Sequence, residues 1–492
     1  MLLSVLLAAA GYALPAGIKD REITGITSDS RTVRDGFLFV AIRGMRQDGN
    51  AFLRDAFRRG AAFAVCERCA GCSEVLVTEN ARAALARLLD AWYGHPARGM
   101  TLIGITGTNG KTSTATMLHS IFTHAGLRCG LIGTVECRLG EEPMLTEGSD
   151  PLSNMTTPDP EQLYALLARM RDGGATHAVM EVTSHALALD KVVPLCFERA
   201  VFTNLTPDHL DLHGDMESYY LEKRKLFAMA KGGVISCLSP IGERLADELD
   251  IPVWRVERGM LDKLEKRGAS GVSFTLQLPS GMPLPLEIPV PGDFSVENGA
   301  LAAITAVSLG ISPTAVQEAL SRFPGVRGRM ERVSQQPTVL LDYAHTPDAL
   351  EKLLRTVRGF CEARQRITVL FGCGGDRDPS KRREMGRIAS ALADLVILTS
   401  DNCRFERCED ILREILRGVD KEKPYRVIPD RRAAILYAIG TARESDVILL
   451  AGKGHENYEI QGAERRYFSE KEIVAEALAA RRGEGQDADL SL

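Results

Sequence analysis

Residues 104–114, GITGTNGKTST, combine glycine, lysine and hydroxyl side chains in the way that phosphate-binding loops do. The common pattern, G-x-x-x-x-G-K-[ST], requires a glycine at position 105, where this chain has Ile105. The glycines before Lys111 are Gly104, Gly107 and Gly110, so the loop is G-x-x-G-K-T. It is either an ordinary glycine-rich turn or a nucleotide loop of another kind, and its place between a strand and a helix favours the nucleotide loop.

This loop is expected to bind a polyphosphate. A buried strand at 100–106 precedes it and a helix at 111–126 follows it, so backbone N–H groups and the helix N-terminus can face an anion. Lys111 would reach the outer phosphates and Thr112 would bind Mg²⁺. The predicted nucleotide-binding residues of the loop are Gly107, Thr108, Asn109, Gly110, Lys111 and Thr112.

A magnesium site is predicted beside the loop. Glu181 lies in a buried strand within 177–184, and His209 follows the next strand, 199–206. Taken singly, Glu181 would be a helix cap and His209 a structural histidine. Together with Thr112 and a phosphate at one sheet edge, they are better explained as Mg²⁺ ligands.

Further polar residues follow four strands in the last third of the chain. These strands are expected at 338–344, 367–373, 394–400 and 446–452. Ligands of parallel sheets gather beyond the carboxyl ends of the strands. The polar residues found there are Asp342, His345, Asp376, Arg377, Asp401, Arg404, Lys453, His455 and Glu456.

The fold that must position these residues is α/β. At 492 residues the chain is too long for one core and suggests about three domains. Turn-rich breaks at 94–99 and 323–330 divide it into 1–97, 98–329 and 330–492. Strands and helices alternate in all three parts, which predicts parallel sheets, and a Pro- and Gly-rich stretch at 279–293 is expected to form hairpins or a loop.

Composition excludes several classes of protein. The net charge of −5 gives no electrostatic reason to expect a nucleic acid partner. The first residues resemble a signal peptide, but no basic residue precedes the apolar stretch, so a short helix from Leu2 to Ala10 closed by Gly11 is preferred. No other apolar run approaches 18 residues, so no membrane span is expected.

The cysteines indicate a reducing cytosol rather than a disulfide framework. There are eleven, an odd number spread along a long chain without regular spacing. The segment CERCAGC places Cys66, Cys69 and Cys72 at the spacing of a metal or cluster site. Because no fourth ligand follows at a matching distance, a loop is favoured there.

Taken in order, the motifs resemble the Mur ligase family. They are GTNGKT, SNMTTPDP, EVTSHAL, TPDHLDLHG, GRME, LDYAHTPDAL, FGCGGDRDPSKR, SDNCR and AGKGHE. Each is weak alone and specific in combination, and the resemblance runs from SDSRTVRDGFLFVAIRG at 28–44 to about residue 470. It implies a UDP-binding N-terminal α/β domain, a central P-loop ATPase-like domain with a parallel sheet, and a C-terminal Rossmann-like α/β domain. The shortened loop is the family's own nucleotide loop.

The resemblance also implies a reaction. Within the family the motifs are most similar to the ligases that extend UDP-N-acetylmuramoyl-L-alanyl-D-glutamate by a third peptide residue, a cytoplasmic step of peptidoglycan synthesis. ATP phosphorylates the D-glutamyl side-chain carboxylate, and the amine of the incoming amino acid attacks the acyl phosphate. Two Mg²⁺ ions and Lys111 would neutralise the crowded oxygens. The enzyme is expected to be a monomer.

Site residues follow from the family motifs. The family's carbamylated lysine, formed with CO₂ and holding the second Mg²⁺, corresponds to Lys223; the alternative is a surface lysine in the EKRK run at 222–225. Asn298, Arg329 and Asp342 would contact ATP. Ser30 would contact UDP, and the muramoyl dipeptide would be held by Thr156, Thr157, Thr183 and Lys191. Thr183 and Lys191 stand where Ser and Arg are usual, and Lys lacks the bidentate fork of Arg.

The amino acid substrate is predicted from DNCR, residues 401–404. The family pattern D-N-P-R marks enzymes that add meso-diaminopimelate, whereas lysine-adding relatives commonly have D-N-P-A. Arg404 can pair with the distal carboxylate that diaminopimelate has and L-lysine lacks, while Cys403 replaces the proline that would stiffen the turn. Diaminopimelate is therefore favoured over L-lysine. The residues assigned to this substrate are Arg377, Asp401, Asn402, Cys403, Arg404, Gly452 and Glu456.

Other nucleotide-binding classes explain less of the chain. A kinase or small GTPase has a glycine loop with Lys and Mg²⁺ but accounts for neither the Lys223 region nor the second α/β domain. Folylpolyglutamate synthetase shares the central domain and reaction type, but the SDSR and DNCR segments argue against it. A non-catalytic scaffold that holds ATP is the remaining alternative.

Overall fold

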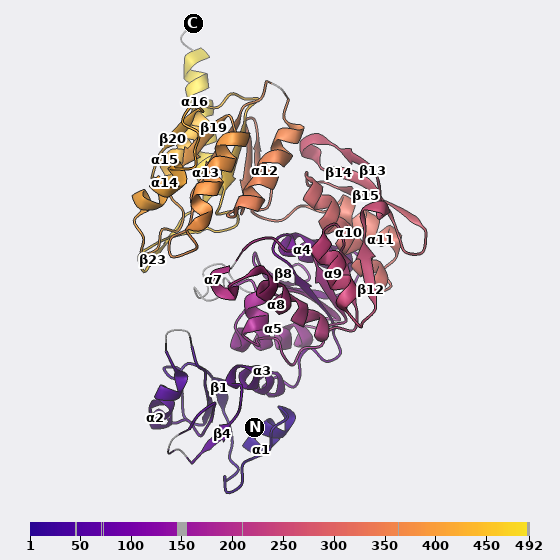
Figure 1. Ribbon diagram of the computed structural model, residues 1–492, viewed down its shortest axis with the longest axis vertical. Helices are drawn as coiled ribbons and strands as arrows, with labels where there is room; N and C mark the ends of the chain where they lie inside the picture. The colour runs from indigo at the N-terminus through magenta and orange to yellow at the C-terminus, as the bar shows by residue number, and fades with distance from the viewer. Residues whose placement is uncertain are drawn as a thin grey trace.

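The computed structural model describes residues 1–44, 47–69, 71, 73–144, 155–208, 210–362 and 364–489. Three lobes follow one another along the chain (Figure 1). The first has a four-stranded parallel sheet of β1 (Gly25–Thr27), β2 (Phe37–Ala41), β3 (Phe63–Cys66) and β4 (Val75–Val77). Its helices are α1 (Leu3–Ala9), α2 (Leu53–Arg58) and α3 (Ala81–Trp92), with a 3₁₀ turn at Gly49–Phe52.

The expected N-terminal helix is confirmed. Its buried leucines, Leu3, Leu6 and Leu7, form one face at helical spacing, and Gly11 follows it with a φ of 84°. This face belongs to a hydrophobic cluster that continues through α3 into the second lobe, so the first lobe is packed on the second rather than tethered to it.

The central lobe contains an eight-stranded sheet in the order β12-β11-β10-β5-β9-β6-β7-β8. Its first six strands run parallel, and β7 and β8 add an antiparallel edge. The strands are β5 (Thr101–Thr106), β6 (Cys129–Ile132), β7 (Cys137–Leu139), β8 (Glu142–Pro143), β9 (His177–Glu181), β10 (Arg199–Phe202), β11 (Gly233–Ser236) and β12 (Val253–Val256). The glycine loop follows β5 in the sheet interior, as the alternation of strands and helices predicted.

Helices cover both faces of this sheet because the strands are apolar on both sides. One hydrophobic cluster joins β5 and β9 to α4, α10 and α11, and another lies on the opposite face with α5 and α8. The helices are α4 (Lys111–His124), α5 (Pro160–Asp172), α6 (Ser184–Ala188), α7 (Leu210–His213), α8 (Met216–Ala228), α9 (Pro240–Glu248), α10 (Asp293–Ser308) and α11 (Pro313–Ser321). The stretch at 279–293 forms part of a hairpin in an antiparallel sheet of β13 (Leu261–Lys266), β14 (Val272–Gln277) and β15 (Pro283–Ile288).

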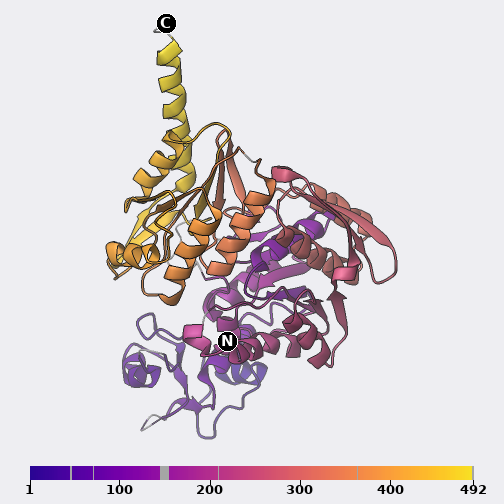
Figure 2. The same ribbon diagram turned by 45° about the horizontal axis from the view of Figure 1, so that its top comes forward.

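The last lobe is a six-stranded sheet in the order β16-β17-β21-β18-β19-β20, parallel except for β16. Its strands are β16 (Glu331–Gln335), β17 (Thr338–Asp342), β18 (Ile367–Phe371), β19 (Leu395–Leu398), β20 (Tyr425–Val427) and β21 (Val447–Ala451). Helices α12 (Pro347–Phe360), α13 (Ser380–Leu392) and α14 (Cys408–Leu416) cover one face. Helices α15 (Arg431–Gly440) and α16 (Glu470–Asp489) cover the other, and α16 projects away from the lobe (Figure 2).

A two-stranded hairpin, β22 (Tyr458–Gln461) and β23 (Glu464–Tyr467), follows β21. Neither it nor the short β20 was expected from the sequence, because both are too short and too polar for a clear pattern. Within the described ranges, no helix is both long and apolar enough to cross a membrane.

Candidate functional site

The glycine loop between β5 and α4 is shaped by positions where no side chain fits. Gly107 and Gly110 have φ values of 144° and 86°, in the region that favours glycine. A Cβ on Gly107 would collide with Thr203 Oγ1, and one on Gly110 with Asn298 Oδ1. Thr203 belongs to the segment after β10 and Asn298 to α10, so two other elements press against the loop and fix its path.

Two buried lysines meet at this loop. Lys111 Nζ donates to the carbonyl oxygens of Gly107 and Thr108, both at 2.9 Å, and Lys223 Nζ donates to the same Gly107 oxygen at 2.9 Å. Lys223 is 2% exposed, so it is not the surface lysine that a mixed charge run usually contains. Burial lowers the pKa of Lys111, and burial together with the charge of Lys111 holds the pKa of Lys223 well below its usual value.

Glu181 presents its carboxylate to the start of α4. Its Oε2 accepts a hydrogen bond from Thr112 Oγ1 at 3.0 Å, and its Oε1 accepts one from the backbone N–H of Thr134 at 2.8 Å. A Cβ on Gly133 would meet this Oε1 at 2.5 Å, so the glycine leaves room for the acid. The cap of α6 is Thr183, whose Oγ1 accepts from Ala186 N, so Glu181 does not act as the helix cap.

His209 lies outside the described residues. Among those that the structure does describe, no three His, Cys, Asp or Glu side chains are grouped to hold a metal ion. Of the predicted metal ligands, Thr112 and Glu181 are in direct contact through their hydrogen bond. Lys223 binds the carbonyl oxygen of Gly107, in the loop that precedes Thr112, rather than either of these side chains.

Hydroxyl groups line the side of the site next to Glu181. Thr157 Oγ1 donates to Glu181 O at 2.9 Å and accepts from Thr183 N at 3.0 Å, while Thr134 Oγ1 donates to Thr156 Oγ1 at 2.9 Å. Lys191 is buried and its Nζ lies 2.7 Å from Asp159 Oδ1. These groups form a polar wall that can offer both donors and a cation to an anionic ligand.

The chain enters the last lobe beside this site. Asp342, at the end of β17, accepts from the N–H groups of Met330 and Ala344 at 2.7 and 2.8 Å, and burial raises its pKa. The guanidinium of Arg329 stacks over the ring of Tyr343, 4.6 Å from its centroid. Arg329 Nε is buried and has no hydrogen-bond partner among the described residues. Buried donors are normally satisfied, so this N–H can donate to a ligand in the site.

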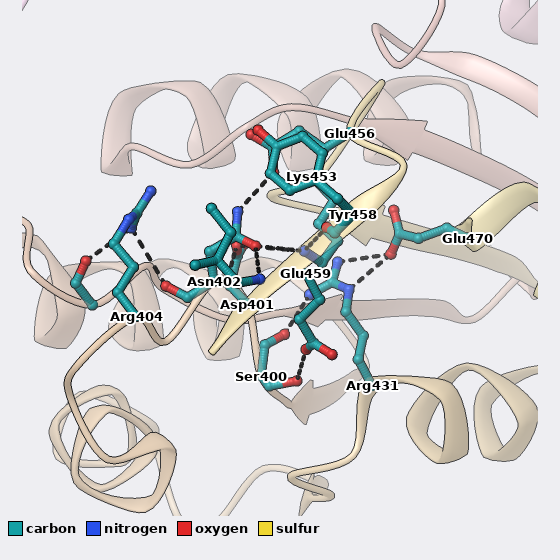
Figure 3. A network of polar contacts seen from close by, with 12 residues as sticks. Ser400, Asp401, Asn402, Arg404, Arg431, Lys453, Glu456, Tyr458, Glu459 and Glu470 are labelled. Carbon is teal, nitrogen blue, oxygen red and sulfur yellow. Dashed lines mark hydrogen bonds and ion pairs between the residues drawn. The ribbon is translucent and has the colours of Figure 1, made fainter. Parts of the chain in front are cut away.

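The carboxyl ends of β19 and β21 carry a dense polar network (Figure 3). Asn402 donates from Nδ2 to Glu456 Oε2 at 2.8 Å, and its Oδ1 accepts from Lys453 Nζ at 3.2 Å and from Ile460 N at 3.0 Å. Burial raises the pKa of Glu456. Burial also opposes ionisation of Asp401, but the charges of Lys453 and Arg431 hold its pKa below its usual value.

Arg404 lies beside this network with a strained backbone. Its φ is 50°, and its Nη1 donates to the carbonyl oxygen of Gly375 at 2.8 Å. The hairpin braces the same residue on both sides, since Arg404 N donates to Ile460 O at 3.1 Å and Gly462 N donates to Arg404 O at 2.7 Å. The same Nη1 also donates to the carbonyl oxygen of Asn402 at 3.4 Å (Figure 3).

A cavity of about 1220 Å³ joins these parts into one site. Its walls come from the glycine loop, the polar wall beside Glu181, the entry to the last lobe and the ends of β18, β19 and β21. This volume is large enough for several small ligands together. The arrangement places a phosphate-binding loop, buried cations and carboxylates along one continuous space.

Three family models cover most of the chain. Residues 22–93 match the model of the Mur ligase family catalytic domain, 105–307 the Mur ligase middle domain, and 328–454 the Mur ligase glutamate ligase domain. The UDP-N-acetylmuramoyl-L-alanyl-D-glutamate--2,6-diaminopimelate ligase of Clostridioides difficile (strain 630) is 40% identical over an alignment of 472 residues, which covers 93% of this chain and 95% of that protein. The chain belongs to the Mur ligase family.

Two further proteins are similar to this Mur ligase over most of its length. The ligase of the same name from Chlorobaculum tepidum is 42% identical and covers 93% of this chain and 92% of that protein. A solved structure described under that name has 28% sequence identity and a TM-score of 0.69, covering 98% of this chain and all of that one. The three-domain α/β architecture is therefore confirmed.

Most of the residues predicted for this Mur ligase line the cavity. They are Thr108, Asn109, Gly110, Lys111, Thr112, Thr156, Thr157, Glu181, Thr183, Lys191, Asn298, Arg329, Asp342, Arg377, Asp401, Asn402, Arg404, Gly452 and Glu456. Four described residues of the predicted set are not among the lining residues: Ser30, Gly107, Lys223 and Cys403. Gly107 and Lys223 lie directly behind the lining loop, whereas Cys403 is buried in the hydrophobic cluster under α13 and α14.

The structure adds lining residues that the sequence-based prediction did not assign to a ligand. Asp208 lines the cavity of this Mur ligase, and its charge acts on both Lys111 and Lys223. Thr134 binds Glu181, and Tyr343 supports Arg329. Asp208 and Tyr343 stand inside the quoted motifs TPDHLDLHG and LDYAHTPDAL, so their positions in those motifs were the available signal. Thr134 had none.

Proposed function

We propose that this Mur ligase uses ATP to join the side-chain carboxylate of the D-glutamyl residue of UDP-N-acetylmuramoyl-L-alanyl-D-glutamate to an amine of meso-diaminopimelate. The observation that carries the proposal is that one continuous cavity is lined by both the glycine loop and Arg404. Acyl phosphate chemistry needs the acid, the phosphate donor and the amine in one space from which water can be kept. The names of the relatives support the same pair of substrates.

ATP is proposed to bind across the loop and the entry to the last lobe. Backbone N–H groups at the N-terminus of α4 can donate hydrogen bonds to the phosphates. Lys111 Nζ would exchange its hydrogen bond with the loop carbonyl of Gly107 for one with a phosphate oxygen. Arg329 supplies a guanidinium whose Nε has no hydrogen-bond partner among the described residues. Asn298 supports Gly110 and lines the cavity, in keeping with a place near the nucleotide.

The donor set beside the loop fits Mg²⁺, which prefers oxygen ligands. Thr112 Oγ1 and the Glu181 carboxylate would hold it, with His209 and a carbamate on Lys223 completing the proposed set of ligands for two ions. Bound Mg²⁺ would neutralise the phosphate oxygens and the charge that develops during transfer. Lys223 itself sits within hydrogen-bonding distance of the loop, and CO₂ added to its amine replaces a cation by an anion there.

The muramoyl dipeptide is proposed to lie along the hydroxyl wall. Thr156, Thr157 and Thr183 offer hydroxyl groups, and Lys191 offers a buried cation to the substrate carboxylates. Ser30, in the first lobe, would contact the UDP end, and that lobe is joined to the second where Ser28 Oγ donates to Glu161 Oε1 at 2.6 Å. The wall thus faces Glu181 and the loop, where phosphoryl transfer would occur.

The amino acid is proposed to occupy the far end of the cavity. Arg404 and Arg377 would bind the distal carboxylate of diaminopimelate, and the acids Asp401 and Glu456 would face its ammonium groups, with Asn402 and Gly452 shaping the wall. L-Lysine has no distal carboxylate, so with that substrate the charge of the Arg404 guanidinium would be desolvated without a carboxylate to pair with.

One assay tests the proposal directly. ADP formation is measured with the UDP-muramoyl dipeptide and either meso-diaminopimelate or L-lysine, and with each component omitted in turn. Turnover should require the dipeptide, ATP, Mg²⁺ and diaminopimelate, and Lys111→Ala should reduce kcat by at least about a hundredfold because it removes a phosphate-neutralising charge. Preference for L-lysine would refute the assignment of Arg404, and ADP release without the dipeptide would refute the ligase assignment.

A further inference from the structure

A carboxylate on α10 lines the cavity beyond the end of β11. Glu297 is partly buried, and its Oε1 accepts a hydrogen bond from Ser236 Oγ at 2.5 Å. Ser236 is the last residue of β11, so this bond fixes the carboxylate at the edge of the sheet where ligands gather. Glu297 stands directly before Asn298, which the sequence assigned to ATP, but was itself given no role.

Glu297 lies within reach of a nucleotide whose phosphates occupy the glycine loop. Asn298 accepts from Thr114 Oγ1 at 3.2 Å and presses against Gly110, so this turn of α10 packs directly on the loop. Successive helix residues point about 100° apart, which turns Glu297 toward Ser236 instead. In the sheet, β10 separates β11 from β5, and neighbouring strands are about 4.8 Å apart, so the carboxylate lies about 10 Å to one side of the loop. A ribose and base extending from the loop would cover this distance.

The carboxylate retains acceptor capacity for a ligand. An ionised carboxyl group offers about four lone-pair sites, and among the described residues Ser236 alone donates a hydrogen bond to this side chain. The charge of Lys352 on α12 acts on Glu297, but Lys352 is paired with Asp348 at 3.0 Å. Burial raises the pKa of Glu297 because the charged form is poorly compensated. A ligand that donates an N–H group to the second oxygen would supply the missing compensation.

Purine bases differ in what they would present to this acceptor. Adenine has the exocyclic N6 amine, a donor, where guanine has O6, an acceptor. The faces of either base are apolar, and the cavity is also lined by Leu238, Leu261 and Val272, from the segment after β11 and from the antiparallel sheet that packs on α10. Guanine would place O6 against the carboxylate and leave two acceptors without a donor between them.

We infer that the Glu297 carboxylate accepts a hydrogen bond from the N6 amine of adenine and thereby selects ATP over GTP, an inference that rests on the proposed function. Ser236 is then a positioning residue, which holds one carboxylate oxygen so that the other faces the base. A site built to hydrogen-bond one group of its ligand rejects an analogue that lacks this group, because the site's own polar atom is left unpaired.

Nucleotide binding measures this selectivity directly. The full-length protein is titrated in a calorimeter, with Mg²⁺ present, with ADP, GDP or purine riboside 5′-diphosphate, which lacks the exocyclic amine. Because a lost hydrogen bond to a charged group costs about tenfold or more in affinity, the wild type should bind ADP at least about tenfold more tightly than the purine riboside diphosphate. GDP should bind more weakly still, since its O6 is repelled as well.

Two substitutions of Glu297 separate recognition of the base from a structural role. The amide of Glu297→Gln can accept from N6 or, after rotation, donate to O6, so GDP should bind about tenfold more tightly than it does to the wild type. Because this is a gain of affinity, misfolding cannot produce it. Glu297→Met removes the acceptor, so ADP and the purine riboside diphosphate should bind equally.

A matched control lies on the next helix. Glu318→Gln changes the same side chain on α11, where it is 52% exposed, and should leave all three affinities as in the wild type. Unchanged GDP affinity in Glu297→Gln, or equal binding of ADP and the purine riboside diphosphate by the wild type, would overturn the inference. A loss of affinity for 2′-deoxy-ADP that Glu297→Met abolishes would place the ribose at this carboxylate and would also overturn it.

These titrations need neither the muramoyl dipeptide nor an amino acid, so they decide the role of Glu297 even if the ligase assignment fails. Failure of the proposed function would instead appear as absence of diaminopimelate-dependent turnover in a protein that still binds ADP selectively.

Discussion

Two lysines two residues apart in α8 have opposite environments. Lys223 is 2% exposed and bonded to the loop carbonyl of Gly107, whereas the Lys225 side chain is 52% exposed and paired with Glu222 at 2.8 Å. A mixed charge run usually lies on a solvated helix face, so composition alone would have placed both outside. Only the family motif indicated that Lys223 faces inward, and the structure supplies the contact.

The pair makes a matched test of the carbamate hypothesis. Lys223→Ala should reduce kcat by at least about a hundredfold by removing a group beside the phosphates, and Lys225→Ala should have little effect because exposed ion pairs contribute little. After equilibration with ¹³C-bicarbonate, a carbamate carbon resonance should appear in the wild type and in Lys225→Ala and be absent from Lys223→Ala. Equal activity of the two variants would contradict a role for Lys223.

At the level of elements, the strands and helices that could be predicted from the sequence are those with a clear local pattern of apolar residues. The strands β5, β9, β10, β17, β18, β19 and β21 were expected because runs of apolar residues end in turn or polar signals. The hairpin β22–β23 was not, because its strands are polar and its role depends on pairing with the Arg404 turn, a contact between distant segments. Cys403 illustrates the same limit: its motif position suggested the amino acid site, but its burial under α14 depends on packing.

One buried arginine joins the elements that hold the amino acid end. Arg382 on α13 is 2% exposed and binds both oxygens of Glu406 at 2.9 Å, together with Glu414 at 3.0 Å and the carbonyl of Gly374 at 3.3 Å. Glu406 also accepts from Asp376 N. The loops after β18 and β19, which carry Arg377 and Arg404, are thus tied to one guanidinium.

Removing the Arg382 guanidinium should change both the free energy of unfolding and the binding of diaminopimelate. Arg382→Met should lower the free energy of unfolding by about 2 kcal/mol, less than for a fully buried pair because both glutamates are partly exposed, and should raise the KM for diaminopimelate. Arg387→Met, on the same helix with its side chain 60% exposed, is the control. Urea unfolding and initial rates measure the two effects; a destabilised variant with an unchanged KM would limit Arg382 to a structural role.

For the whole molecule, the cavity exists because the central and last lobes face each other across it. Asn109 on the glycine loop donates to Asp348 on α12 at 3.0 Å, and Arg329 and Asp342 reach the cavity from the connecting chain. The relative placement of the lobes therefore sets the distance between the phosphate end and the amino acid end. The chain crosses between them where Gly328 packs against the backbone of Gly454 and His455.

Gly328 is the position where this placement can be tested. Its φ is 67°, and a Cβ there would collide with the backbone of the 454–455 loop, which follows Lys453 and precedes Glu456. In Gly328→Ala the left-handed conformation alone costs about 1–2 kcal/mol, and the added Cβ must also displace the connecting chain from the 454–455 loop. We expect kcat/KM for ATP and for diaminopimelate to fall together, by about tenfold or more, because both ends of the cavity shift. Gly440→Ala, at the end of α15 with nothing within 4 Å of its added Cβ, should behave as the wild type. A Gly328→Ala enzyme with normal kinetics for both substrates would show that the connection tolerates displacement and that the cavity is not set by this crossing.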